Sequence, residues 1–479
     1  MLFNSFGYAV FLPVVFALYW LAKRAGIKLQ NRILSVASLF FYACWDYRFL
    51  GLLIFSTLLD YITGIKMYRS KIKSEKTFWF WLSVIVNLSF LGVFKYYNFF
   101  VDSFSELLAN AGFHVNAWSL QIILPVGISF YTFHGLSYII DIYKNKIKPE
   151  TDLVDYSLFV SFFPLLVAGP IERATHLLPQ IKRVREFKPS SAYDGLRQIL
   201  WGLFKKIVIA DNCAVYADLI FNNSSEHSGS TLILGAVLFA FQIYGDFSGY
   251  SDIALGTARL FGIELLRNFA YPYFSRDIAE FWRRWHISLS SWFKDYLYIP
   301  LGGSRSNNWM KIRNTLIIFI VSGFWHGANW TFIIWGMLNA IYIIPSILFE
   351  RNRNNLEVVA KGRMFPTINE FFAILTTFSL TVFSWIFFRA ESLNHAISYI
   401  LGICNPYEFW QPQLVPAIVI FMVILFIFIE WLGREKSYGL EMIHNIKIPY
   451  LRIACYYGII FAILSFGNFQ ANQFIYFQF

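Results

Sequence analysis

The chain has 479 residues, of which 57% are hydrophobic and only 14% are charged. A soluble globular domain carries about 25% charged residues, so this chain lacks the polar side chains that would cover a water-soluble body. Its net charge of +11 would suit a nucleic-acid-binding protein, but the lysines and arginines gather in short loops between apolar runs, a pattern that excludes nucleic acid as a partner and predicts an integral membrane protein.

A helix needs about 20 apolar residues to cross a bilayer. Runs of this kind predict spans at Leu2–Leu21, Leu29–Trp45, Phe49–Ile65, Thr77–Asn98, Ser119–Ile140, Gly195–Phe221, Thr231–Tyr250, Phe371–Phe388, Leu414–Trp431 and Ile453–Phe466. Basic clusters at 23–32, 66–76 and 144–148 fall in alternate loops, which predicts that the N-terminus lies outside and these loops lie in the cytoplasm. We detect no repeat and no soluble segment, so we expect a single membrane domain over residues 1–479.

Two further apolar segments break this alternation. The segment Leu153–Pro170 is followed by the basic cluster 182–188. If the segment crossed the bilayer fully, this cluster would lie outside, so we expect the segment to be re-entrant, entering and leaving on the cytoplasmic side. The segment Asn314–Phe349 is long for one helix and short for two, which predicts two shortened segments that meet near Gly323 and Gly327. Broken backbone at membrane depth needs protein or a water-filled cavity around it. The predicted fold class is therefore an all-α, polytopic membrane protein with about 10 to 12 segments, some of them re-entrant or half-spanning.

An ionisable residue inside a bilayer is costly and is a candidate for function. His326 stands between glycines in SGFWHGANW, and a neutral imidazole there could take a proton from a hydroxyl and return it to a leaving group. Its neighbours Trp325 and Asn329 are candidates for lining a tunnel or binding a donor. The simpler interpretation is a histidine that is hydrogen-bonded within a helix bundle.

A second histidine, His286, lies in the amphipathic stretch FWRRWHISLS. The adjacent Arg283 and Arg284 could bind phosphates, because a guanidinium matches the geometry of phosphate oxygens. They could equally anchor an interfacial helix to lipid headgroups.

Two carboxylates, Asp246 and Asp252, end an apolar span within YGDFSGYSD. They could orient a histidine or shape a polar tunnel, and the alternative is a hydrogen-bonded helix break. No phosphate-cradling Gly-Lys-Ser/Thr loop, His-Glu-x-x-His motif or Gly-x-Ser-x-Gly elbow appears, which argues against an ATPase, a zinc hydrolase and a serine esterase. The four cysteines lack metal-ligand spacing, and we predict no metal site.

These features occur within five ordered blocks that resemble the membrane-bound O-acyltransferase (MBOAT) family, in particular its bacterial alginate O-acetylation subgroup. The blocks are FPLLVAGPIER, WGLFKKIVIAD, QIYGDFSGYSDIALG, FWRRWHISLSSWFKDYLYIPLGG and SGFWHGANWTFIIWG, and the tail NQFIYFQF is similar as well. The family's characteristic histidine falls on His326, and a second histidine of the bacterial branch falls on His286.

The resemblance implies a helical ring around a central tunnel that reaches the histidine. It also implies a cytoplasmic thioester donor, acetyl-CoA, with no tightly bound cofactor. The acetyl group would pass to an exported polysaccharide such as alginate, through a separate extracytoplasmic O-acetyltransferase partner. The expected location is the bacterial inner membrane, with many passes. We expect His326 to act as general base, either directly or through an acyl-histidine, and His286 with Arg283 and Arg284 to guide the donor.

The acetylated polymer could also be peptidoglycan or cellulose. Three alternatives to acetyl transfer stay open at this stage. The related branch transfers D-alanine from a carrier-protein thioester to polymers of the teichoic acid type. A transporter could use His326 as a proton relay. A membrane scaffold could recruit an extracytoplasmic enzyme and would retain acetylation without His326.

Overall fold

The computed structural model describes residues 1–113, 119–120, 123–166, 169–304, 307–405, 409–410, 412–469 and 474–475. Across these ranges the regular elements are helices, which confirms the all-α prediction. The chain forms two compact units, one of Met1–Lys188 with Leu260–Leu265 and the other of Pro189–Arg259 with Leu266–Phe479. The single domain predicted over the whole length stays a prediction.

Several helices are long and apolar enough to cross a membrane. Seven such stretches occur in the described part of the chain: Phe6–Ala25, Tyr47–Arg69, Lys73–Asn110, Gly229–Leu260, Trp330–Leu348, Ile368–Arg389 and Pro449–Phe466. Shorter apolar helices occur at Leu153–Leu166, Leu393–Ile403 and Ala417–Gly433. Together they confirm a polytopic membrane protein.

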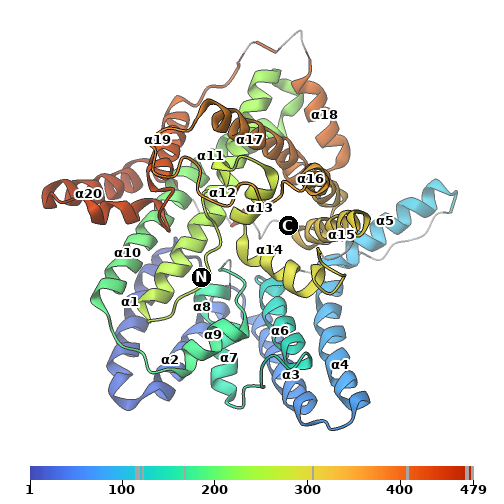
Figure 1. Ribbon diagram of the computed structural model, residues 1–479, viewed down its shortest axis with the longest axis vertical. Helices are drawn as coiled ribbons and strands as arrows, with labels where there is room; N and C mark the ends of the chain where they lie inside the picture. Colours follow the sequence, from blue (N-terminus) through green and yellow to red (C-terminus); the bar gives the residue numbers. More distant parts are fainter. Residues whose placement is uncertain are drawn as a thin grey trace. The chain divides into compact units, whose positions relative to one another are not determined.

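The first unit is built from the N-terminal helices. They are α1 (Phe6–Leu21), α2 (Ile27–Ala43), α3 (Leu50–Arg69), α4 (Lys73–Leu91), α5 (Tyr97–Asn110), α6 (Ile128–Tyr143), α7 (Leu153–Ser161), α8 (Phe163–Leu166) and α9 (Ala174–Lys182). Helices α3, α4 and α6 pack against one another (Figure 1). The buried Asp60 of α3 accepts hydrogen bonds from Ser83 and Asn87 of α4. Such polar contacts join helices where apolar surfaces alone give little preference.

The segment predicted to be re-entrant is indeed broken. Helix α7 ends at Ser161 and α8 begins at Phe163, so the nine residues of α7 rise only about 14 Å, too little to cross a bilayer. The Ser38 hydroxyl accepts a hydrogen bond from the Phe163 N–H at 3.0 Å, which satisfies a backbone donor at the break. Entry and exit on one side of the membrane stays a prediction.

The second unit contains α10 (Pro189–Leu203), η4 (Phe204–Ala210), α11 (Asp211–Asn222), α12 (Gly229–Leu260), α13 (Ile278–Arg284), α14 (Ile287–Phe293), α15 (Asn308–His326), α16 (Trp330–Leu348), α17 (Ile368–Arg389), α18 (Leu393–Ile403), α19 (Ala417–Gly433) and α20 (Pro449–Phe466). Helix α12 is the most enclosed of the candidate spans, since 83% of its most apolar 18-residue stretch is buried. Helix α20 is the least enclosed, with 6% of the corresponding stretch buried.

Helices α15 and α16 form the pair predicted to meet near Gly323 and Gly327, and they lie side by side (Figure 1). The prediction that both are shortened is wrong, because each has 19 residues and α16 is long and apolar enough to cross a membrane. The reason is that α15 begins at Asn308, earlier than the sequence indicated. A Cβ atom on Gly323 would lie 2.2 Å from the Phe332 carbonyl oxygen. Only glycine therefore permits this close crossing, which fixes the position of the turn after His326.

A second close crossing joins α10 and η4 to α12. A Cβ atom on Gly249 would lie 2.8 Å from the Gly202 carbonyl oxygen, and one on Gly202 would lie 2.5 Å from the Gly249 carbonyl oxygen. Reciprocal glycines allow two backbones to approach as in small-residue contacts between membrane helices. The crossing places the lysines of η4 next to the acidic residues of α12.

Candidate active site

His326 is the last residue of α15 and lies in an aromatic enclosure. Its side chain is buried, with a relative exposure of 3% for the residue. The ring of Trp335 meets the imidazole edge-on, with ring centroids 5.1 Å apart, and Phe388 lies at 5.5 Å. Trp385 stacks on Trp335 and packs on Phe388, and so closes a second layer. The imidazole thus stands in surroundings that exclude bulk water.

The structure brings His286 next to His326, although 40 residues separate them in the chain. Their ring centroids are 6.4 Å apart. His286 is the N-cap of α14 and has a left-handed backbone, with φ of 44°. A non-glycine residue in this conformation costs about 1 to 3 kcal/mol and is often found at functional sites. The fold therefore holds this histidine in a specific orientation at some cost.

Asn268 orients the imidazole of His286. Its side-chain oxygen Oδ1 lies 3.0 Å from Nδ1 of His286 and also accepts a hydrogen bond from the Ser288 hydroxyl at 2.9 Å. The Asn268 side-chain nitrogen donates to the Ser251 hydroxyl. This contact supports the orientation of the amide in which its oxygen, and not its nitrogen, faces His286. An oxygen acceptor requires a proton on Nδ1, so the neutral ring keeps its lone pair on Nε2.

The environment of His286 also sets its charge. Burial lowers the pKa of the His286 imidazole to about 3. The ring is therefore neutral at physiological pH, which is the form that can accept a proton. Phe247 of α12 packs edge-on against it, with centroids 4.6 Å apart.

The C-terminal segment reaches this region through Phe474 and Ile475. The Phe474 ring lies 5.8 Å from the ring of Phe247, and the Ile475 N–H donates to Oδ2 of Asp246 at 2.8 Å. The other residues of the tail NQFIYFQF lie outside the described residues.

Asp246 and Asp252 form ion pairs with lysines of η4. Lys206 lies 2.9 Å from Asp246 and 2.7 Å from Asp211, while Lys205 lies 2.6 Å from Asp252. Burying such charges is tolerable only when they are paired. The alternative of a helix break at these residues is wrong, because α12 continues unbroken to Leu260. The glycines of YGDFSGYSD instead permit the close crossing with α10 and η4.

The residues beside His326 have distinct environments. Trp325 lies beside both histidines, with its ring 4.9 Å from His326 and 6.2 Å from His286. Asn329 is the N-cap of α16, accepting a hydrogen bond from the Thr331 N–H at 3.0 Å and donating to the Glu391 carbonyl. Trp325 is thus part of the site's wall, whereas Asn329 shapes the turn that follows the histidine.

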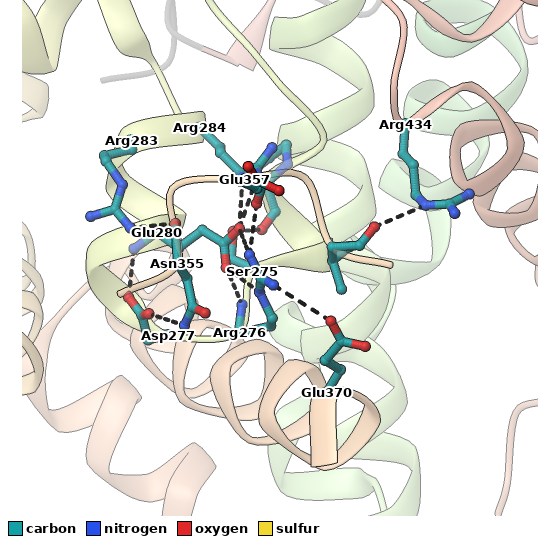
Figure 2. A network of polar contacts seen from close by, with 12 residues as sticks. Ser275, Arg276, Asp277, Glu280, Arg283, Arg284, Asn355, Glu357, Glu370 and Arg434 are labelled. Atoms are coloured by element: carbon teal, nitrogen blue, oxygen red, sulfur yellow. Dashed lines mark hydrogen bonds and ion pairs between the residues drawn. The ribbon is translucent and has the colours of Figure 1, made fainter. Parts of the chain in front are cut away.

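Arg283 and Arg284 hold a loop that follows α16, the segment 352–363 (Figure 2). Arg283 donates to the carbonyl oxygens of Asn352 and Asn355 at 2.7 and 2.9 Å. Arg284 donates to the buried carboxylate of Glu280 at 2.8 Å and to the Glu357 carbonyl at 3.1 Å.

Two other arginines complete this network. Arg276 pairs with Glu280 at 3.1 Å and with Glu370 at 3.5 Å, and Arg434 donates to the Val359 carbonyl at 3.1 Å. In Figure 2 these side chains converge on the loop from several elements. The network ties the 352–363 segment to α13, the helix that leads directly into His286.

Sequence reasoning missed several residues of the site: Asn268, Phe247, Trp335, Phe388, Lys205 and Lys206. The lysines could have been found, since two adjacent lysines in the apolar run of WGLFKKIVIAD are costly unless paired. Asn268 carries no such signal, because a single asparagine in a loop is ordinary.

The chain is similar to known proteins over most of its length. The model of MBOAT, the membrane-bound O-acyltransferase family, matches residues 144–388, a range that includes both histidines. A probable alginate O-acetylase AlgI of Pseudomonas putida is 37% identical over 436 residues, covering 90% of this chain and 86% of the relative. A peptidoglycan O-acetyltransferase of Helicobacter pylori is 37% identical over 425 residues, covering 82% and 77%.

A more distant relative is a teichoic acid D-alanyltransferase of Bacillus subtilis, which is 28% identical over 288 residues and covers 57% of this chain and 71% of its own length. The family match and the long similarities at more than a third identity lead to one conclusion. The chain is an O-acyltransferase and belongs to the membrane-bound O-acyltransferase family.

Proposed function

We propose that this enzyme takes an acetyl group from acetyl-CoA and supplies it for the O-acetylation of an exported polysaccharide such as alginate. The observation that carries the proposal is the pair of buried histidines with ring centroids 6.4 Å apart. His326 supplies the general base, and the neutral His286 stands within reach of the same reacting groups.

In the proposed reaction an acceptor hydroxyl approaches His326 as its oxygen attacks the thioester carbonyl. The new C–O bond forms, the hydroxyl proton passes to the imidazole, and the C–S bond breaks. The departing thiolate then takes the proton back from the imidazolium, so the histidine is regenerated. A positioned base of this kind contributes about 10²- to 10⁴-fold to the rate.

The aromatic enclosure serves the same reaction. Trp335 and Phe388 leave little room for water beside His326. Exclusion of water limits hydrolysis of the thioester and strengthens electrostatic interactions with the developing charge. This favours transfer to a bound hydroxyl.

His286 and its neighbours are proposed to guide the donor. The Nε2 lone pair of His286 can accept a hydrogen bond from donor or acceptor, since Nδ1 faces Asn268. We propose that Arg283 and Arg284 act near the donor's phosphates while also holding the 352–363 segment. Asp246 and Asp252 contribute by keeping η4 against α12.

The choice of acetyl over D-alanyl rests on similarity. The acetylating relatives match more of the chain at higher identity than the D-alanyl relative does. On the same ground we propose a multi-pass location in the bacterial inner membrane and an extracytoplasmic O-acetyltransferase partner that completes delivery to the polymer.

The deciding experiment measures transfer of label from radiolabelled acetyl-CoA in membranes that contain this chain, its native neighbours and the exported polymer. His326→Ala should reduce transfer at least 100-fold at equal protein abundance, whereas the control His227→Ala, a loop histidine whose Nδ1 contacts Gln413, should retain it. Undiminished transfer by His326→Ala would support a scaffold.

A second comparison separates the donors. Membranes supplied with acetyl-CoA should acylate the polymer, and membranes supplied with a D-alanyl carrier-protein thioester should not. The reverse result would assign the enzyme to D-alanyl transfer. Acid quench during turnover should show no label on His326, and a trapped acyl-histidine would replace direct transfer by a covalent relay.

A further inference from the structure

A groove of about 880 Å³ lies between α10 and α20 in the second unit, and neither His286 nor His326 lines it. Its walls come from the start of α10, the loop before α20 and one face of α20. Its lining includes Asp194, Leu196, Arg197, Leu200, Arg452, Tyr456 and Ile460.

The groove changes from polar to apolar along its length. On α20, Arg452, Tyr456 and Ile460 are spaced four residues apart and therefore share one face. On α10, Arg197 precedes Leu200 in the same order. Both helices thus present a cationic side chain nearer the N-terminus and an apolar one further along, which is the polarity of a lipid with a headgroup and a chain.

The polar end carries an excess of positive charge. Asp194 lies 3.5 Å from Arg197 and 2.5 Å from Arg259, so one carboxylate is shared by two arginines. Among the residues that the structure describes, no acidic side chain lies within ion-pair distance of Arg452. The groove therefore complements an anion, and guanidinium groups match phosphate oxygens.

The apolar end is exposed at the surface of the unit. Helix α20 is the least enclosed candidate span of the described chain, and Ile460 is 40% exposed. The basic cluster 182–188 directly precedes α10, and Lys447 lies two residues before the start of α20, so loop charge predicts that both helices begin on the cytoplasmic side. The headgroups of the anionic lipids of that leaflet lie at this level.

We propose that this groove binds one anionic glycerophospholipid, with its phosphate between Arg452 and Arg197 and an acyl chain along Leu200 and Ile460. This site is separate from the acyl-transfer reaction. Its occupant would fill the space between two helices that touch only sparsely, and so would join α20 to the rest of the unit.

The test uses the full chain in nanodiscs that contain phosphatidylglycerol and phosphatidylcholine, with native mass spectrometry of the lipid that stays bound. Arg452→Gln should reduce retained phosphatidylglycerol roughly tenfold, the loss expected for one charge-assisted contact. Arg452→Lys should retain most of it. The matched control is Lys447→Gln, which removes the same charge from an exposed position that is not part of the groove lining.

A second variant tests the apolar half without changing charge. Ile460→Trp should fill the groove and displace the lipid, and phosphatidylglycerol should then no longer raise the unfolding temperature above that in pure phosphatidylcholine. Equal retention by wild type, Arg452→Gln and Ile460→Trp would overturn the proposal. It would also be overturned if Lys447→Gln lost as much lipid as Arg452→Gln, or if a second copy of the chain filled the groove.

Discussion

Nδ1 of His286 lies 3.0 Å from Oδ1 of Asn268, and this contact places the imidazole proton on Nδ1 and leaves the lone pair on Nε2. The backbone supports the same arrangement, since the Ile287 N–H donates to the Asn268 carbonyl at 2.9 Å. One asparagine thus sets both the tautomer and the position of a histidine that is 18 residues away.

Asn268→Ala should lower acetyl transfer about 10- to 100-fold, because the ring loses the acceptor that selects its tautomer. Asn268→Asp should shift the acidic limb of the pH–rate profile to higher pH, since a carboxylate beside Nδ1 favours the imidazolium. Both rates are measured with radiolabelled acetyl-CoA at equal abundance. Ser288→Ala removes a different donor to Asn268 and is the control. An unshifted profile for Asn268→Asp would show that Asn268 does not govern His286.

The stability of the enzyme should depend on pH through His286. Its pKa is lowered from 6.5 to about 3 in the folded chain, so between these values the unfolded chain binds a proton that the folded chain does not. This contribution to stability is complete above about pH 6.5 and declines on acidification by about 1.4 kcal/mol per pH unit. His286→Gln should therefore flatten the dependence of the unfolding temperature on pH. Parallel curves for wild type and variant would contradict this assignment.

The crossing of α10 with α12 should tolerate no side chain at Gly249. A methyl group there would lie 2.8 Å from the Gly202 carbonyl oxygen, so the backbones must separate. Gly249→Ala should destabilise the protein by about 1 to 3 kcal/mol. The unfolding temperature in detergent measures this effect. Gly458→Ala is the matched control, because nothing lies within 4 Å of the added atom and alanine favours a helix. Equal unfolding temperatures for the two variants would show that the crossing can relax.

The ion pairs of Glu280 should keep the 352–363 segment in place. Glu280→Gln leaves Arg276 and Arg284 without their shared carboxylate, which should destabilise this region by about 3 kcal/mol. Trypsin should then cut faster at Arg353, Lys361 or Arg363. The control Glu357→Gln changes an exposed side chain whose ion pair with Lys361 contributes little. Cleavage at the wild-type rate would mean that the remaining contacts are sufficient to hold the loop.

Several parts of this protein could be predicted without a structure, for local reasons. The apolar runs and the loop charges identified a polytopic membrane protein, because each span must itself be apolar enough to lie in the hydrocarbon core. The same signals located the interruption within 153–170 and the meeting of two helices before Gly327. The chemistry of His326 and the motif around it make it a candidate for the general base, which stays a prediction.

The sequence by itself therefore determined the class of protein and the approximate positions of its helices, and it offered two histidines as candidates for the site. Tertiary structure decided how the site is assembled: the approach of His286 to His326, the choice of Asn268 as the partner of Nδ1, and the pairing of Lys205 and Lys206 with Asp252 and Asp246. The physical reason is that hydrophobicity and charge act locally along the chain. Contacts between residues tens of positions apart depend on which helix faces can pack, and here glycines such as Gly202 and Gly249 set that packing.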